Sequence, residues 1–275
     1  MEPRRLSVLL TACCVVMLPV LMAAPCGAIE SLYPTALISV KGGVLVHLGC
    51  GDGRLIAKIS ATKTYVVHGL EPNAGLVQAA RARLVEAGLY GRVSVSVFAG
   101  PCLPYADRLI NALFVSKPCG VPVSELERVL APGGELLSKQ ALRSSLVSDG
   151  VRSGWYVYRK IWPDTIDAWP QYQHGADGNC VARDTEVGVP RVLQWKAGPR
   201  WSQHHNRANS MTAMVSAGGR VFYLLDDAPP GASGMPGRWH VYARDAFNGV
   251  LLWKKPVDHW GWPAWSDHPL PMQGF

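Results

Sequence analysis

Charged residues are scarce in this 275-residue sequence, and its basic residues are not clustered. Asp, Glu, Lys and Arg make up 17% of the chain and hydrophobic residues 48%, a balance typical of globular proteins rather than disordered ones. The net charge of +7 comes from 27 Lys and Arg residues scattered along the chain. Without a basic patch, no nucleic-acid partner is expected. The length allows one large or two ordinary domains.

The cysteine spacings that bind zinc or attach haem are also missing. Three of the seven cysteines fall within the first 28 residues. The other four are Cys50, Cys102, Cys119 and Cys180. They form neither a C-x-x-C nor a C-x-x-C-H motif, and the adjacent His204 and His205 have no third ligand at a suitable spacing. The sequence therefore predicts no metal site.

Tryptophan is absent from the first half of the chain. All ten tryptophans lie at Trp155 or later, whereas the earlier part contains a glycine-rich loop and alternates between strand-like and helix-like segments. This shift in composition indicates two architectures joined in one chain.

The N-terminus has the layout of a secretory signal peptide. Arg4 and Arg5 precede an apolar run over residues 6–24, and the small-residue stretch 26–28 follows it. We expect cleavage near Ala28 and export to the periplasm or cell envelope of a bacterium. Because the run is nearly long enough to span a bilayer, an uncleaved membrane anchor over residues 1–28 is the alternative.

Residues 44–55, V-L-V-H-L-G-C-G-D-G-R-L, predict a strand, a tight loop and the start of a helix. Gly49, Gly51 and Gly53 lack a Cβ atom, so the loop can turn sharply and bring backbone N–H groups close to a ligand. A dinucleotide fingerprint needs glycine at the position of Arg54. The spacing therefore indicates a cofactor loop and disfavours NAD.

The next segments extend this pattern into a parallel sheet. A second strand over residues 65–70 ends at Glu71, where an acid in an open α/β sheet can accept both hydroxyls of a ribose. Asn73 is expected to cap a helix that Gly88 ends. Further strands are predicted over residues 92–98, 109–116, 135–139 and 155–160, with a helix over 122–130. The fold class is therefore α/β doubly wound, Rossmann-like.

Four motifs together resemble the class I S-adenosylmethionine-dependent methyltransferases. They are V-L-V-H-L-G-C-G-D-G-R-L, H-G-L-E-P-N followed by A-R-A-R-L, L-P-Y-A-D, and E-R-V-L-A-P-G-G-E-L-L, in this order over about 120 residues. The resemblance implies that residues 38–162 bind S-adenosylmethionine. It implies that Gly49, Gly51 and Gly53 pass under the cofactor and that Glu71 holds its ribose. Cys50, inside the loop, is a further candidate for a cofactor contact, and the alternative is that it is a small packing residue. Methyl transfer depends mainly on positioning, so no catalytic residue is nominated.

Two positions and one length depart from that family's pattern. After the fifth strand the chain is shorter than is usual in the family, with little room for the usual final hairpin. The family usually has an acid where this chain has His47, and an Asp after the third strand where it has Ala99. Losing one charge-assisted contact typically costs about 1.5 to 3 kcal/mol, or one to two decades in affinity.

The second region, residues 163–275, differs from the first in its composition and in its expected secondary structure. Residues 163–190, rich in Pro, Gly and Asp, predict an irregular connector. In residues 191–275, short strands are expected over 192–196, 211–216, 220–225, 239–244 and 250–254. The last four match one blade of a β-propeller in size and order.

The phrase V-Y-A-R-D-A-F-N-G-V-L-L-W-K, over residues 241–254, resembles the repeat of quinoprotein-type propellers, which are related to pyrroloquinoline quinone (PQQ) enzymes. The resemblance implies that Asp245 and Gly249 form a turn and that Trp253 packs between blades. One blade cannot close a ring, so the propeller region is expected to be incomplete and the chain to be the front of a longer product. PQQ binding is not supported, because it needs a full ring and a metal site.

Taken together, these patterns predict an S-adenosylmethionine-binding, methyltransferase-like domain, active or degenerate, fused to a propeller-like region. The alternative is a non-catalytic exported binding or scaffold protein that uses the propeller, with a partner that the sequence does not identify. A small-molecule cofactor is the expected partner of the first domain.

Overall fold

The computed structural model describes residues 37–60, 65–186, 188, 193–199, 211–229 and 237–258. The expected signal segment, the His204–His205 pair and the tryptophans after Trp253 lie outside these residues. No helix among the described residues is long and apolar enough to cross a membrane.

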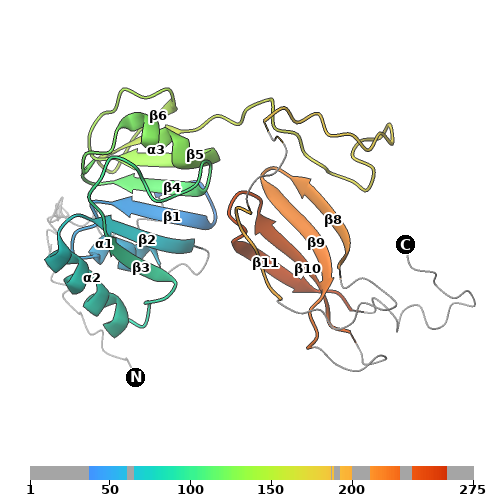
Figure 1. The fold of residues 1–275 in the computed structure, drawn as a ribbon, viewed down its shortest axis with the longest axis horizontal. Coiled ribbons are helices and arrows are strands. Elements are labelled where there is room, and N and C mark those ends of the chain that lie inside the picture. Colours follow the sequence, from blue (N-terminus) through green and yellow to red (C-terminus); the bar gives the residue numbers. More distant parts are fainter. Residues whose placement is uncertain are drawn as a thin grey trace, which may run out of the picture. The chain divides into compact units, whose positions relative to one another are not determined.

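The first domain is built on a seven-stranded sheet (Figure 1). Its elements are β1 (Gly43–Leu48), α1 (Arg54–Ile59), β2 (Tyr65–Glu71), α2 (Ala74–Glu86), β3 (Val93–Val97), β4 (Ile110–Val115), α3 (Val123–Val129), β5 (Leu130–Ser138), β6 (Val147–Arg152) and β7 (Trp155–Arg159). The strand order is β3-β2-β1-β4-β5-β7-β6, with β1 to β5 parallel. The predicted doubly wound architecture is therefore present, and Asn73 caps α2 by accepting a hydrogen bond from the Leu76 N–H.

Apolar side chains fill both faces of this sheet, as expected when crossover helices cover a parallel sheet on each side. On one face, buried residues of α1 and α2, such as Ile56 and Leu84, pack with Leu45 and Phe114. On the other face, residues of α3 pack with Val46 and its neighbours. Figure 1 shows α1 and α2 close to β2 and β3, and α3 close to β5.

The sheet contains a final hairpin, although little room for one is expected from the sequence. β6 pairs antiparallel with β7, and β7 pairs antiparallel with β5. The prediction was wrong because β6, V-S-D-G-V-R, is polar and largely exposed, so it lacks the hydrophobic alternation that marks a half-buried strand.

Four strands of the second region form a separate antiparallel sheet. They are β8 (Met211–Ala217), β9 (Arg220–Asp226), β10 (Trp239–Asp245) and β11 (Leu251–Pro256), in the order β11-β10-β9-β8. The predicted meander is confirmed, whereas its identity as a propeller blade remains a prediction. Leu193 to Lys196, expected to be part of a strand, has no regular structure. Residues 163–186 and 188 contain none of the named helices or strands.

The turn after β10 is held by the Asp245 carboxylate. Its Oδ1 accepts hydrogen bonds from the N–H groups of Phe247 and Asn248, and Gly249 adopts a left-handed φ of 72°. Its Oδ2 accepts a hydrogen bond from Asn111 Nδ2 at 2.7 Å. Asn111 Oδ1 in turn accepts from the Val44 N–H at 2.8 Å and from Asn248 Nδ2 at 2.6 Å. Asn111 on β4 is therefore the centre of a buried polar network.

Replacing Asn111 with leucine is expected to lower the free energy of unfolding by about 2 kcal/mol, because it leaves the Val44 N–H and the buried Asp245 carboxylate short of partners. Urea unfolding followed by tryptophan fluorescence measures this. The matched control is Asn179→Leu at an exposed connector position, which should change stability by less than about 0.5 kcal/mol. Equal stability of the two variants would show that the network contributes nothing.

Candidate functional site

The glycine loop lies where the strand order of the sheet reverses. From β1, the chain proceeds to β2 and β3 on one side and to β4 and β5 on the other. In open α/β sheets, ligands bind at such a switch point, outside the carboxyl ends of the strands. The loop follows β1 at this edge and is tied to the end of β2, because the Gly49 and Cys50 N–H groups donate to the Leu70 carbonyl at 2.8 and 3.3 Å.

The three glycines of the loop have different surroundings. All are left-handed, with φ of 70° at Gly49, 57° at Gly51 and 79° at Gly53. A Cβ atom on Gly49 would lie 2.8 Å from Lys117 Cβ, and one on Gly53 would lie 2.9 Å from Ala80 Cβ. A Cβ on Gly51 would meet nothing within 4 Å. Gly49 and Gly53 are thus required by packing, whereas Gly51 borders open space that a ligand can use.

Glu71 lies beside the same loop, as the sequence predicted for the end of β2. It is 3% exposed, and its Oε2 accepts a hydrogen bond from the Gly51 N–H at 2.9 Å. Its Oε1 accepts from the Asn73 N–H at 3.3 Å. A carboxylate offers about four acceptor positions, so Glu71 can hold the loop and still accept hydrogen bonds from a ligand.

Cys50 contributes to the loop through its backbone. Its side chain is buried in the core cluster on the α1 and α2 face, next to Gly69, where a Cβ atom would come within 2.8 Å of Sγ. Burial, and secondarily the charge of Glu71, raises the pKa of the Cys50 thiol to about 12. The thiol is therefore neutral at pH 7 and acts as a packing group.

His47 is buried at the end of β1, two residues before the loop. It is 2% exposed, and its Nε2 lies 2.8 Å from Ser116 Oγ at the end of β4. Its Nδ1 has no hydrogen-bond partner among the residues that the structure describes. Burial lowers the pKa of His47 to about 4, so the ring is neutral at pH 7. Ala99 is exposed and has no charged group. Neither His47 nor Ala99 therefore supplies a charge beside the glycine loop.

The structure also shows contacts that sequence reasoning missed. Asp52, within the loop, forms an ion pair with Arg83 of α2, and Ser116 contacts His47. The A-R-A-R-L motif places Arg83 on the helix that follows Asn73. Helix periodicity does not reveal which residue the Arg83 side chain contacts. His68 is a strand residue, as predicted, hydrogen-bonded to Tyr105 at 2.7 Å.

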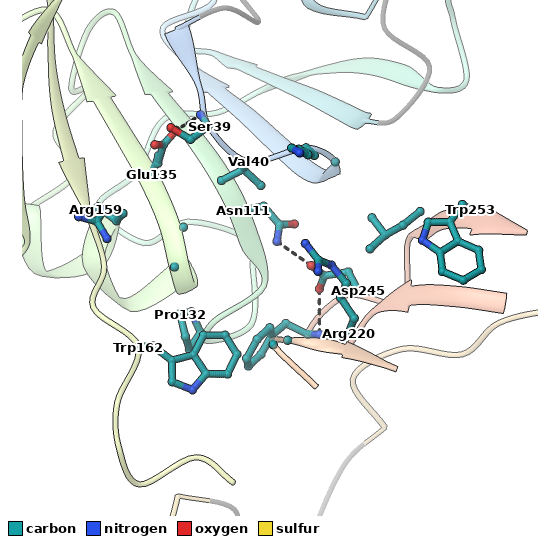
Figure 2. Close-up of a pocket in the computed structure, with 18 residues that line it drawn as sticks. Ser39, Val40, Asn111, Pro132, Glu135, Arg159, Trp162, Arg220, Asp245 and Trp253 are labelled. Carbon is teal, nitrogen blue, oxygen red and sulfur yellow. Dashed lines mark hydrogen bonds between the residues drawn. The ribbon is translucent and has the colours of Figure 1, made fainter. Parts of the chain in front are cut away.

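A cavity lies at the opposite edge of the sheet, near the amino ends of β1, β4 and β5 (Figure 2). Its lining includes Asn111, Glu135, Trp162 and Asp245, and Figure 2 shows Asn111 and Asp245 pointing toward each other. Burial raises the pKa of Asp245, although the hydrogen bond from Asn111 opposes this. The glycine loop and Glu71 lie at the carboxyl edge of the sheet, so this cavity is separate from the site that they form.

No protein-family model matches this sequence. Among solved structures, the chain is similar to a S-adenosylmethionine-dependent methyltransferase of Aquifex aeolicus (20% identity, TM-score 0.33), with 38% of this chain and 62% of that one covered. It is also similar to geranyl diphosphate C-methyltransferase of Streptomyces coelicolor (21%, 0.33; 36% and 39% covered) and to the cyclase SpnF (25%, 0.36; 43% and 48% covered). The chain spans less than two thirds of the length of each of these proteins.

Proposed function

We propose that the first domain, residues 38–162, binds S-adenosylmethionine at the glycine loop and acts as a methyltransferase. The observation that carries this proposal is the pairing of Gly51 with Glu71. Gly51 borders open space, and its N–H donates to a buried carboxylate at the switch point of the sheet. A small ligand with a pair of hydroxyls fits this arrangement, since Glu71 keeps free acceptor positions. The missing glycine at Arg54 argues against a dinucleotide.

In this proposal, Gly49, Gly51 and Gly53 form the floor of the site, and Glu71 accepts hydrogen bonds from the ribose. When bound, the cofactor supplies an electrophilic methyl group. The protein's part is to hold that group in line with a nucleophile and to exclude water, because positioning supplies much of the rate enhancement in transfer reactions. Cys50, buried and neutral, is assigned a packing role. No base is assigned.

The direct test is calorimetric titration of the full chain with S-adenosylmethionine and with S-adenosylhomocysteine. Saturable binding with 1:1 stoichiometry would support the proposal. Absence of heat at millimolar ligand would overturn it.

Replacing Gly51 with alanine is expected to weaken S-adenosylhomocysteine binding by roughly ten- to thirtyfold, because the new Cβ occupies the space left for the ligand. Stability should fall by only about 1 kcal/mol, the cost of a left-handed alanine. The matched control is Gly88→Ala after α2, since Gly88 is also left-handed and a Cβ there also meets nothing within 4 Å. Titration and thermal unfolding of both variants separate ligand exclusion from backbone strain, and equal affinities would contradict the proposed ligand position.

His47 and Ala99 favour a second candidate, a non-catalytic exported protein whose propeller-like region binds a partner. Neither residue places a carboxylate at the site, so this candidate expects weak or absent cofactor binding. Restoring acids at both positions should then create binding that the unmodified chain lacks. Binding by the unmodified chain would count against this candidate.

A further inference from the structure

Arg83 joins the glycine loop to α2 at two points. Its Nη2 lies 3.1 Å from Asp52 Oδ2, and its Nε donates a hydrogen bond to the Asp52 carbonyl at 3.2 Å. Asp52 lies between Gly51 and Gly53, at the tip of the loop. The guanidinium therefore holds both the side chain and the backbone of the residue next to the proposed ligand-facing glycine.

The helix that carries Arg83 is a rigid support. Val77, Ala80 and Leu84 of α2 are fully buried against the sheet, and Ala80 is the residue that packs against Gly53. The loop itself has three left-handed glycines, which have more conformational freedom than other residues. Contacts from α2 therefore restrict a segment that would otherwise sample many conformations.

The exposure of the pair indicates what this contact does. The Arg83 side chain is 40% exposed and the Asp52 side chain 33% exposed. Ion pairs at such positions contribute little to global stability. The Asp52 carboxylate also lies 2.8 Å from Arg54 Nε, so Arg83 is not its only cation. Fixing the local conformation of the loop is the effect that this geometry favours.

We propose that Arg83 is a positioning residue that keeps the glycine loop in the conformation that binds the cofactor. This inference rests on the proposed function, because it assumes that the loop holds a ligand. Arg83 does not itself contact the ligand in this proposal. It acts through Asp52, by keeping the Gly51 N–H on Glu71 and the space above Gly51 open.

The test compares Arg83→Met, Arg83→Lys and Arg81→Met in the full chain. Arg81 is the matched control, since it lies on the same helix and donates from Nε to the Val95 carbonyl at 2.9 Å, away from the loop. S-adenosylhomocysteine affinity should fall roughly three- to tenfold in Arg83→Met, a range that corresponds to the loss of one or two partly exposed contacts. Arg83→Lys should recover part of the loss, and Arg81→Met should bind as the wild type does. The melting temperatures of the two methionine variants should agree within a few degrees.

Hydrogen–deuterium exchange of the ligand-free chains separates this inference from the proposed function. Amides of residues 49–53 should exchange faster in Arg83→Met than in Arg81→Met, whether or not the wild type binds the cofactor. Failure of the wild type to bind S-adenosylhomocysteine would remove the proposed function alone. Unchanged loop exchange in Arg83→Met, or an equal loss of affinity in Arg81→Met, would overturn the role of Arg83.

Discussion

Replacing Glu71 with glutamine is expected to weaken S-adenosylhomocysteine binding by roughly a hundredfold, which corresponds to about 3 kcal/mol. Both carboxylate oxygens of Glu71 accept backbone hydrogen bonds, from Gly51 and from Asn73. Glutamine has nearly the same shape but only one acceptor oxygen, so its amide NH₂ would face one of these N–H groups. The variant also loses the negative charge that strengthens hydrogen bonds from ligand hydroxyls.

Isothermal titration calorimetry of the variant and of Glu86→Gln measures this effect. Glu86 is exposed at the end of α2 and serves as the matched control, because its substitution removes the same charge away from the loop. Equal affinities in the two variants would contradict the assignment of Glu71 to the ligand. Circular dichroism of both variants establishes that the fold is intact.

The parts of the fold that could be predicted carry their signal locally. The glycine loop, the acid at the end of β2 and the Asn73 cap are short segments in which residue type determines the backbone conformation. β1 to β4 and α2 have apolar residues at the spacing of their element and lie close to the predicted ranges. β5, predicted over residues 135–139, begins earlier, at Leu130, because the Ala131-Pro132-Gly133-Gly134 segment is part of the strand. The relative position of Gly51 and Glu71 then follows from the topology of a parallel sheet.

The parts that could not be predicted depend on contacts between distant residues. Asn111 meets Asp245 across 134 positions of sequence, and Arg83 meets Asp52 across 31. Residue type alone does not show that the Cys50 side chain lies in the core rather than in the site. Conversely, Leu193 to Lys196 has the local composition of a strand but belongs to no strand among the residues that the structure describes, and β propensity is known to depend on context.

The buried His47 leads to an expected loss of stability in mild acid. The pKa of His47 is lowered by burial to about 4 in the folded chain, whereas an unfolded histidine titrates near about 6.5. Between these values the unfolded chain binds more protons, so the free energy of unfolding rises with pH. The stability gained by burying the neutral His47 ring is therefore fully present above about pH 6.5 and is lost as the pH falls toward 4. From pH 7 to pH 5 the loss amounts to about 2 kcal/mol.

His47→Gln isolates this contribution, because glutamine can still reach Ser116 Oγ but does not titrate. Urea unfolding at pH 7 and pH 5 should show a pH difference about 2 kcal/mol smaller in His47→Gln than in the wild type. His240→Gln is the control, since it removes a histidine of the second sheet and leaves His47 in place. Burial also lowers the pKa of His68. In both variants the free energy of unfolding should therefore still rise with pH because of His68. An unchanged pH difference in His47→Gln would show that folding does not lower the pKa of His47, because the ring would then protonate in the folded chain at the same pH as in the unfolded chain.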